Sequence, residues 1–186
     1  IWTPWFGILG SKTGFDAIGD CYADLTPHVF ALETGLSADP PMCWRIPALD
    51  RYRLISCSDC HSPQKLGREA TILDCAPDYA AIRTALMTGK GYVGTLEFFP
   101  EEGKYHWDGH RACHVCLHPD EVKALNGKCP VCGRRLTLGV LHRVLALAGR
   151  DAPVKPPTGG SVESLVPLTE ILSELLGAGV ASQRVQ

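Results

Sequence analysis

The chain has 186 residues, of which 45% are hydrophobic, 20% are charged and 8% are aromatic, and its formal net charge is −2. This balance is typical of a folded globular protein and excludes an intrinsically disordered chain. No apolar run approaches the roughly 20 residues of a membrane-spanning helix, so the sequence predicts no membrane as a partner. Because the net charge is near zero, any binding to nucleic acid must come from a local basic patch.

Both ends of the sequence are typical of cut points, and we expect a piece of a longer protein. The chain opens without methionine on the aromatic-rich residues 1–6 and closes on residues 182–186, which read as the middle of an element. No basic segment leads into a long apolar one, so no secretory signal is predicted. The nine cysteines include two CxxC pairs, which are more typical of metal binding in a reducing compartment than of a secreted disulfide scaffold. We therefore expect a cytoplasmic protein.

Short apolar runs alternate with Gly, Pro and Asp over the first 100 residues. The predicted strands are residues 29–33, 52–57 and 92–99, and the predicted helices are residues 43–49 and 79–88. Asp78 is a good N-cap for the second helix, and Gly89 ends it. Strands that alternate with helices favour an α/β fold with parallel strands.

The second half of the chain changes in composition. Residues 101–135 are polar and rich in His and Cys, residues 136–147 have helical spacing, and residues 152–160 are a Pro/Gly-rich linker. Residues 167–176 predict an amphipathic helix with Pro at its start. The sequence thus predicts three parts: an α/β domain over residues 1–100, a metal-binding domain over 101–150, and a linker with a helical tail over 151–186.

Two cysteine pairs form the most specific motif. Cys113 and Cys116 are separated by a twelve-residue gap from Cys129 and Cys132. This spacing predicts one structural zinc held by four thiolates in a closed tetrahedron, with metal-free buried thiols or a redox pair as alternatives. Four neighbouring histidines could substitute for a cysteine, but four cysteines need no further ligand, so we expect these histidines on the surface; they are His106, His110, His114 and His118.

Basic residues gather in and just after the cysteine motif. They are Arg111, Lys123, Lys128, Arg134, Arg135, Arg143 and Arg150. Such a cluster is suited to phosphate contacts, although a solvated charged face explains it equally well.

A second motif, Ser-Asp-Cys-His, follows the predicted strand over residues 52–57. Asp59 and His61 can point an oxygen and an imidazole into one cleft at the carboxyl end of that strand. Glu33 ends its own apolar strand in the same way, and a metal is a natural partner for its carboxylate. A hydrogen-bonded Asp–His pair and a turn-capping glutamate are the alternatives.

Seven segments of the chain resemble the endonuclease Q family, whose members carry a PHP (polymerase and histidinol phosphatase) domain. The segments are residues 5–16, 25–37, 58–63, 67–71, 97–106, 108–111 and 139–144. The resemblance implies the C-terminal part of a PHP-type (β/α)7 barrel, followed by a small four-cysteine zinc-binding domain and helices. It also implies a DNA repair endonuclease that nicks the backbone 5′ of deaminated bases (uracil, hypoxanthine or xanthine) or of abasic sites.

The resemblance further implies site residues and cofactors. Glu33, Asp59 and His61 fall on ligands of a catalytic cluster of two or three divalent metals (Zn, Mn, Mg or Fe), and the four cysteines fall on the zinc ligands. The other PHP ligands, including the HxH pair, are absent, so the N-terminal PHP half is an expected partner. Cys43 and Cys60 also depart from the family pattern.

Residues near the expected metals are candidates for DNA contacts. They are Trp5, Ser11, Lys12, Trp44, Arg45, Arg68, Glu69, Arg134 and Arg135, together with Trp2 and Phe6. Ordinary core packing is the alternative for each aromatic side chain. The expected partners are DNA with deaminated bases and replication or repair proteins, which implies a nucleoid-associated location.

Two other classes of function remain open. One is a PHP phosphoesterase that acts on a small phosphate monoester, although such a substrate needs no DNA-sized platform. The other is a non-catalytic zinc-ribbon fragment that binds nucleic acid, in which Asp59 and His61 are only structural.

Overall fold

The computed structural model of the chain describes residues 7–12 and 14–185. Its helices are α1 (Ile18–Tyr22), α2 (Pro40–Cys43), α3 (Tyr79–Thr88), α4 (Pro119–Ala124), α5 (Val140–Leu147) and α6 (Leu168–Leu176). Its strands are β1 (Ala31–Glu33), β2 (Arg53–Ile55), β3 (Ala70–Leu73), β4 (Tyr92–Glu97), β5 (Asp108–His110), β6 (Val115–Leu117) and β7 (Ser161–Ser164). Short 3-10 turns are η1 (Ala23–His28), η2 (Pro47–Leu49), η3 (Pro63–Lys65), η4 (Pro100–Glu102) and η5 (Arg111–Cys113).

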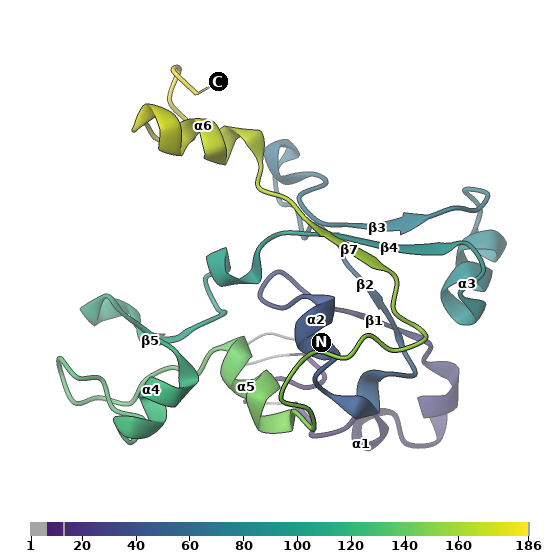
Figure 1. Ribbon diagram of the computed structural model, residues 1–186, viewed down its shortest axis with the longest axis horizontal. Coiled ribbons are helices and arrows are strands. Elements are labelled where there is room, and N and C mark those ends of the chain that lie inside the picture. Colours follow the sequence, from purple (N-terminus) through teal and green to yellow (C-terminus); the bar gives the residue numbers. More distant parts are fainter. Residues whose placement is uncertain (1–6, 13, 186) are drawn as a thin grey trace.

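The strands form three small sheets. β1 and β2 pair in parallel. β4 is the centre of the second sheet, antiparallel to β3 and parallel to β7. β5 and β6 form an antiparallel hairpin that lies with α4 at the opposite end of the molecule from α3 (Figure 1). The α/β class with parallel pairs is therefore confirmed, but the described residues form these separate sheets and no closed barrel.

The main hydrophobic core joins the beginning of the chain to α5. Leu9 and Ile18 pack in one cluster with Leu54 of β2 and with Val140 and Val144 of α5, all of them buried. A second, smaller core lies in the cysteine-rich segment and contains Val122, Cys129 and Leu136. The smaller core buries little apolar surface, so this segment needs another source of stability.

Several helices end where local rules place them. Asp78 accepts a hydrogen bond from the Ala81 N–H at 2.9 Å, and Gly89 closes α3 with φ of 84°. The tail helix is confirmed as α6, which extends away from β7 (Figure 1). In the described residues, no helix has the length and apolar character needed to cross a membrane.

Two predicted helices were wrong in extent. The expected helix over residues 43–49 is instead the end of α2 followed by η2, which begins at Pro47. Proline has no N–H for a helical hydrogen bond, so the turn restarts there. The expected helix over residues 136–147 begins only at Val140, because Leu136 is used in the small core and its N–H bonds to the Gly127 carbonyl.

Candidate functional site

Four side chains in the cysteine-rich segment form a cluster suited to a metal ion. The ligand atoms of His110, Cys113, Cys129 and Cys132 all lie within 4.8 Å of one another. His110 Nδ1 lies 3.4 Å from Cys132 Sγ. One imidazole and three thiolates are a donor set that zinc prefers in structural sites, so the residues present fit that ion.

The local fold brings these four residues together. His110 ends β5, and η5 returns the chain so that Cys113 follows three residues later. The second pair sits on a tight turn in which the Gly133 N–H donates to the Cys129 carbonyl at 2.9 Å, with φ of 72° at Gly133. A positive φ of this size favours glycine, so residue 133 lets the turn close around the cluster.

The thiols of the cluster are electrostatically coupled. Burial opposes ionisation of Cys129, but the N–H groups of Cys132 and Val131 point at its sulfur and lower its pKa to about 6. Burial and the neighbouring sulfurs raise the pKa of Cys113 to about 11. One thiolate therefore forms readily, and a cation at the centre would favour ionisation of the others.

Cys116 lies outside this cluster, which differs from the predicted four-cysteine site at one ligand. Cys116 is exposed on β6, where it pairs with Gly109 of β5, whereas Val115 pairs with His110. Successive strand residues face opposite sides, so the strand turns Cys116 away from the position of His110. The HxxC spacing of His110 and Cys113 was the signal that could have identified the histidine.

The other three histidines lie outside the cluster. His106 is 2% exposed, and its Nδ1 lies 3.0 Å from the Ser37 carbonyl oxygen. The His118 side chain accepts the Asp120 N–H at the start of α4, and His114 adopts a left-handed turn conformation with φ of 53°. The expectation of surface histidines is therefore wrong for the buried His106.

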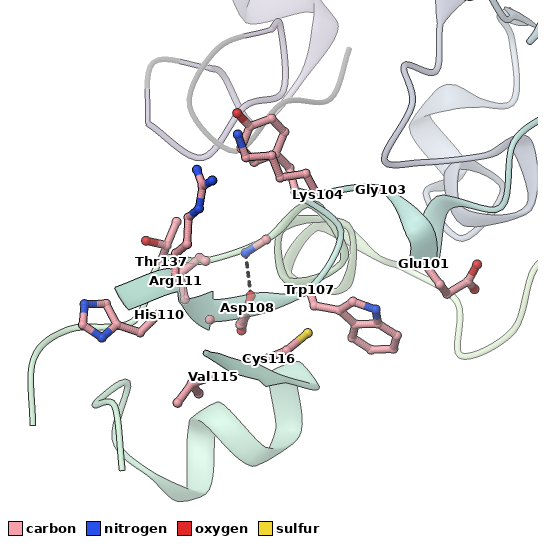
Figure 2. Close-up of a pocket in the computed structure, with 14 residues that line it drawn as sticks. Glu101, Gly103, Lys104, Trp107, Asp108, His110, Arg111, Val115, Cys116 and Thr137 are labelled. Atoms are coloured by element: carbon pink, nitrogen blue, oxygen red, sulfur yellow. Dashed lines mark hydrogen bonds between the residues drawn. The ribbon is translucent and has the colours of Figure 1, made fainter. Parts of the chain in front are cut away.

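A pocket of about 520 Å³ adjoins the cluster along β5. Figure 2 shows the charged ends of Lys104 and Arg111 on one side of this pocket and the Trp107 ring and Cys116 thiol on the other. Asp108, at the pocket floor, is fully buried and accepts the Gly139 N–H at 2.6 Å. The lining thus combines aromatic and basic side chains with the acidic Glu101 and Asp108.

The predicted catalytic residues lie at one edge of the parallel pair. Glu33 ends β1 and is paired in register with Ile55 at the end of β2, after which the chain runs to Asp59 and His61. His61 Nδ1 lies 2.9 Å from the Asp59 carbonyl oxygen, and the two side chains are 86% and 65% exposed. Among the described residues these three do not form a compact ligand cluster of the kind found at His110.

Asp59 has a left-handed backbone, with φ of 46°. Only a few per cent of residues other than glycine adopt such a conformation, and Asp is among those that tolerate it best. The Arg68 Nε–H donates to the Ser58 carbonyl at 2.8 Å and so fixes the base of this loop. The turn therefore presents Asp59 and His61 outward.

The expected DNA-contact residues have varied environments. Trp2, Trp5 and Phe6 lie outside the described residues. Ser11, Lys12, Arg134 and Arg135 are exposed, whereas Glu69 is 2% exposed and its side chain does not reach the surface. Trp44 packs against the main core, and the Arg45 Nε–H donates to the Arg150 carbonyl at 3.4 Å.

Two members of the basic cluster are engaged inside the molecule. Arg143 donates to the carbonyls of Leu9 and Phe15 and pairs with Asp16 at 2.7 Å. Arg150 pairs with Asp50 and also donates to the Trp44 carbonyl. Of the cluster, Arg111, Lys123, Lys128, Arg134 and Arg135 remain exposed.

Comparisons with known proteins show which proteins this chain is similar to. No protein-family model matches the chain. The uncharacterized protein MJ0043 of Methanocaldococcus jannaschii is 34% identical over 99% of this chain and 23% of its own length. The uncharacterized protein YqxK of Bacillus subtilis is 32% identical over 63% of this chain and 30% of its own length. The chain thus spans less than a third of these curated relatives.

Two solved structures share its fold. The crystal structure of the lesion-specific endonuclease PfuEndoQ from Pyrococcus furiosus matches with a TM-score of 0.82 and 33% identity, over 98% of this chain and 45% of that one. Endonuclease Q in complex with a 27-mer duplex substrate, with an abasic lesion at the active site, matches with a TM-score of 0.83 and 32% identity over 98% and 46%. Over 98% of its length, the chain therefore matches the fold of endonuclease Q at 32–33% sequence identity, which confirms the predicted resemblance.

Proposed function

We propose that this chain is part of a metal-dependent DNA repair endonuclease that nicks the backbone 5′ of deaminated bases or abasic sites. The observation that carries the proposal is the match over 98% of the chain to endonuclease Q, one of whose structures holds an abasic duplex. The chain spans only about 45% of those proteins, so the proposal includes the N-terminal PHP half as a necessary partner. In this proposal, β1, β2 and the residues around them form the C-terminal part of a PHP barrel.

In this proposal Glu33, Asp59 and His61 are ligands of the catalytic metals. With Nδ1 of His61 held against the Asp59 carbonyl oxygen, Nε2 is the nitrogen left to face outward. A backbone carbonyl partner of this kind fixes the ring orientation of metal-binding histidines. Divalent metals at such a site would supply a hydroxide nucleophile and neutralise charge on the leaving oxygen. The exposure of Asp59 and His61 leaves room for ligands from the N-terminal half.

The cluster of His110, Cys113, Cys129 and Cys132 is proposed to hold one structural zinc. A closed set of four protein ligands leaves no position for water, so the ion would order the segment rather than react. The small core of this segment buries few side chains, so metal binding would supply much of its folding free energy. The exposed Arg134 and Arg135 follow Cys132 after one residue, Gly133, and would be held in place for phosphate contacts.

The decisive experiment uses this chain together with the N-terminal half. A labelled duplex with one central uracil or abasic site is incubated with the protein and a divalent metal, and cleavage products are mapped. We expect one nick on the 5′ side of the lesion and none in the undamaged duplex. A chromogenic phosphate monoester is the control substrate, and its rapid hydrolysis with an intact duplex would instead identify a small-molecule phosphoesterase. Binding of the duplex with cleavage of neither substrate would support the non-catalytic zinc-ribbon alternative.

A further inference from the structure

Two glutamates are buried directly opposite each other in the β3–β4 sheet. Ala70 pairs with Leu96 in antiparallel register, and continuing this register by one step places Glu69, which directly precedes β3, opposite Glu97. Side chains directly opposite in such a pair have Cβ atoms about 4.5–5.5 Å apart. Glu69 is 2% exposed and Glu97 is fully buried. Like charges in this arrangement repel, and burial adds a desolvation cost to each.

The pair lacks a cationic partner among the described residues. Neither carboxylate takes part in any ion pair that the described residues form. The nearest guanidinium, that of Arg68, acts on Glu69 but donates its Nε–H to the Ser58 carbonyl. The Oε2 atoms of both glutamates are buried and make no hydrogen bond within the described part of the chain. Orphaned charged oxygens of this kind are rare in folded proteins and call for a ligand or a proton.

Hydroxyl groups make up much of the surroundings of the pair, and the Phe98 N–H donates to Glu69 Oε1 at 3.4 Å. Glu97 Oε1 accepts the Ser56 hydroxyl at 2.6 Å, and that hydroxyl lies 2.7 Å from Thr34 Oγ1. Thr71 Oγ1 bonds both the N–H and the carbonyl of Ser56, and the Thr95 hydroxyl, which is fully buried, lies near Glu97. β2 contacts β4, the centre of the sheet that also contains β3 and β7 (Figure 1).

We propose that Glu69 and Glu97, with the Thr95 hydroxyl, bind one divalent cation that prefers oxygen ligands, such as Mg²⁺ or Mn²⁺. Carboxylates coordinate through one or both oxygens, so the two side chains and the hydroxyl supply up to five donors. A set without nitrogen or sulfur favours these hard cations over zinc. The proposed ligands are different side chains from Glu33, Asp59 and His61, and the proposal does not depend on the nuclease function.

Electrostatics agree with the geometry. Burial, followed by the charge of Glu97, raises the pKa of Glu69 to about 8. Burial also raises the pKa of Glu97 to about 7, against the lowering effect of the Ser56 and Thr95 hydroxyls. Near neutral pH the pair therefore holds a proton easily displaced by a cation. Glu33 and Asp39 add negative potential at this position, which strengthens the attraction for a cation.

The test measures Mn²⁺ binding by the electron paramagnetic resonance signal of the free ion, with zinc first supplied to the cysteine cluster. Glu69→Gln and Glu97→Gln keep the side-chain shape and remove the charge. Glu101→Gln, an exposed glutamate on η4, is the matched control. Asp59→Asn combined with His61→Ala removes two of the proposed nuclease ligands. We expect one Mn²⁺ to persist in that double variant and in Glu101→Gln, and at least tenfold weaker binding in either buried-glutamate variant.

Thermal unfolding provides a second readout. Mn²⁺ at about a hundred times its Kd should raise the Tm of the parent protein by roughly 5–10 °C, and it should leave the Tm of Glu97→Gln unchanged. In EDTA, the Tm of Glu97→Gln should equal or exceed that of the parent, because glutamine removes the repulsion between the two carboxylates. Equal Mn²⁺ binding in all variants, or loss of binding only in the Asp59 and His61 variant, would overturn the site. If the glutamine variants fail to fold in EDTA, the proposal is also overturned. That result would mean that the fold needs the two carboxylates even when no cation is bound.

Discussion

The contact between the cysteine-rich hairpin and α5 depends on one buried carboxylate. Asp108 of β5 accepts the Gly139 N–H, at the first turn of α5, through Oδ1 at 2.6 Å. Its Oδ2 lies 2.6 Å from His142 Nδ1, and Asp108 is fully buried whereas the His142 side chain is 23% exposed. Gly139 has no side chain of its own to cap the helix, so Asp108 performs that role from a distant strand.

The cost of removing this carboxylate follows from those contacts. Asp108→Ala leaves a buried N–H and an imidazole without partners, which costs about 3–5 kcal/mol for a broken buried pair. Asp108→Asn keeps an acceptor for the Gly139 N–H and loses only the charge, so about 1–2 kcal/mol is expected. His142→Ala removes the more exposed partner and should cost less than Asp108→Ala. For a chain of this length, each kcal/mol lowers Tm by about 2–4 °C.

The assay is thermal and urea unfolding of the parent protein and of the variants Asp108→Ala, Asp108→Asn and His142→Ala. The double variant Asp108→Ala/His142→Ala completes a double-mutant cycle. The two single effects should be non-additive, with an interaction energy of at least about 1 kcal/mol, because both remove the same contact. If each change costs less than about 1 kcal/mol and the two add, the carboxylate does not link the hairpin to α5, and this reasoning is refuted.

The remaining predictions concern the metal and DNA contacts. His110→Ala should release zinc to a competing chelator, whereas Cys116→Ser should keep it, as measured by metal analysis after dialysis; the opposite order would restore the four-cysteine set. Asp59→Asn, with the N-terminal half present, should abolish nicking and leave duplex affinity largely unchanged; weaker binding with unchanged nicking at saturation would contradict a ligand role. Arg134→Glu with Arg135→Glu should weaken binding to damaged and undamaged duplexes alike. It should also lower the slope of log affinity against log salt by about two units, and an unchanged slope would favour a solvated face.

Much of the local structure could be predicted from the sequence because short-range rules decide it. Asp78 and Gly89 bound α3 through contacts within four residues, so the prediction there is confirmed. β3 and β7 were missed because each exists through pairing with β4, and residues 161–164 pair with a strand almost seventy positions earlier. Such pairing is specified by tertiary contacts that no local pattern reveals.

In the candidate site too, local motifs could be predicted from the sequence, whereas features that depend on tertiary contacts could not. The two CxxC pairs indicated a metal-binding cluster, and three of the four cysteines do meet. The choice of His110 over Cys116 depends on the facing of the β5–β6 hairpin, which the sequence did not predict as a hairpin. The burial of Glu69 also depends on its partner strand, so a residue expected at the DNA surface lies inside the protein.

The main core has a consequence for how the chain folds as it is made. Leu9 and Ile18 share that core with Val140 and Val144. Arg143 donates hydrogen bonds to the carbonyls of Leu9 and Phe15. Contacts across more than 120 positions cannot form until α5 has left the ribosome, and such high contact order slows folding. A piece that stops at residue 100 would expose this apolar surface, so it should aggregate during expression. Adding residues 101–150 to the same polypeptide should restore its solubility.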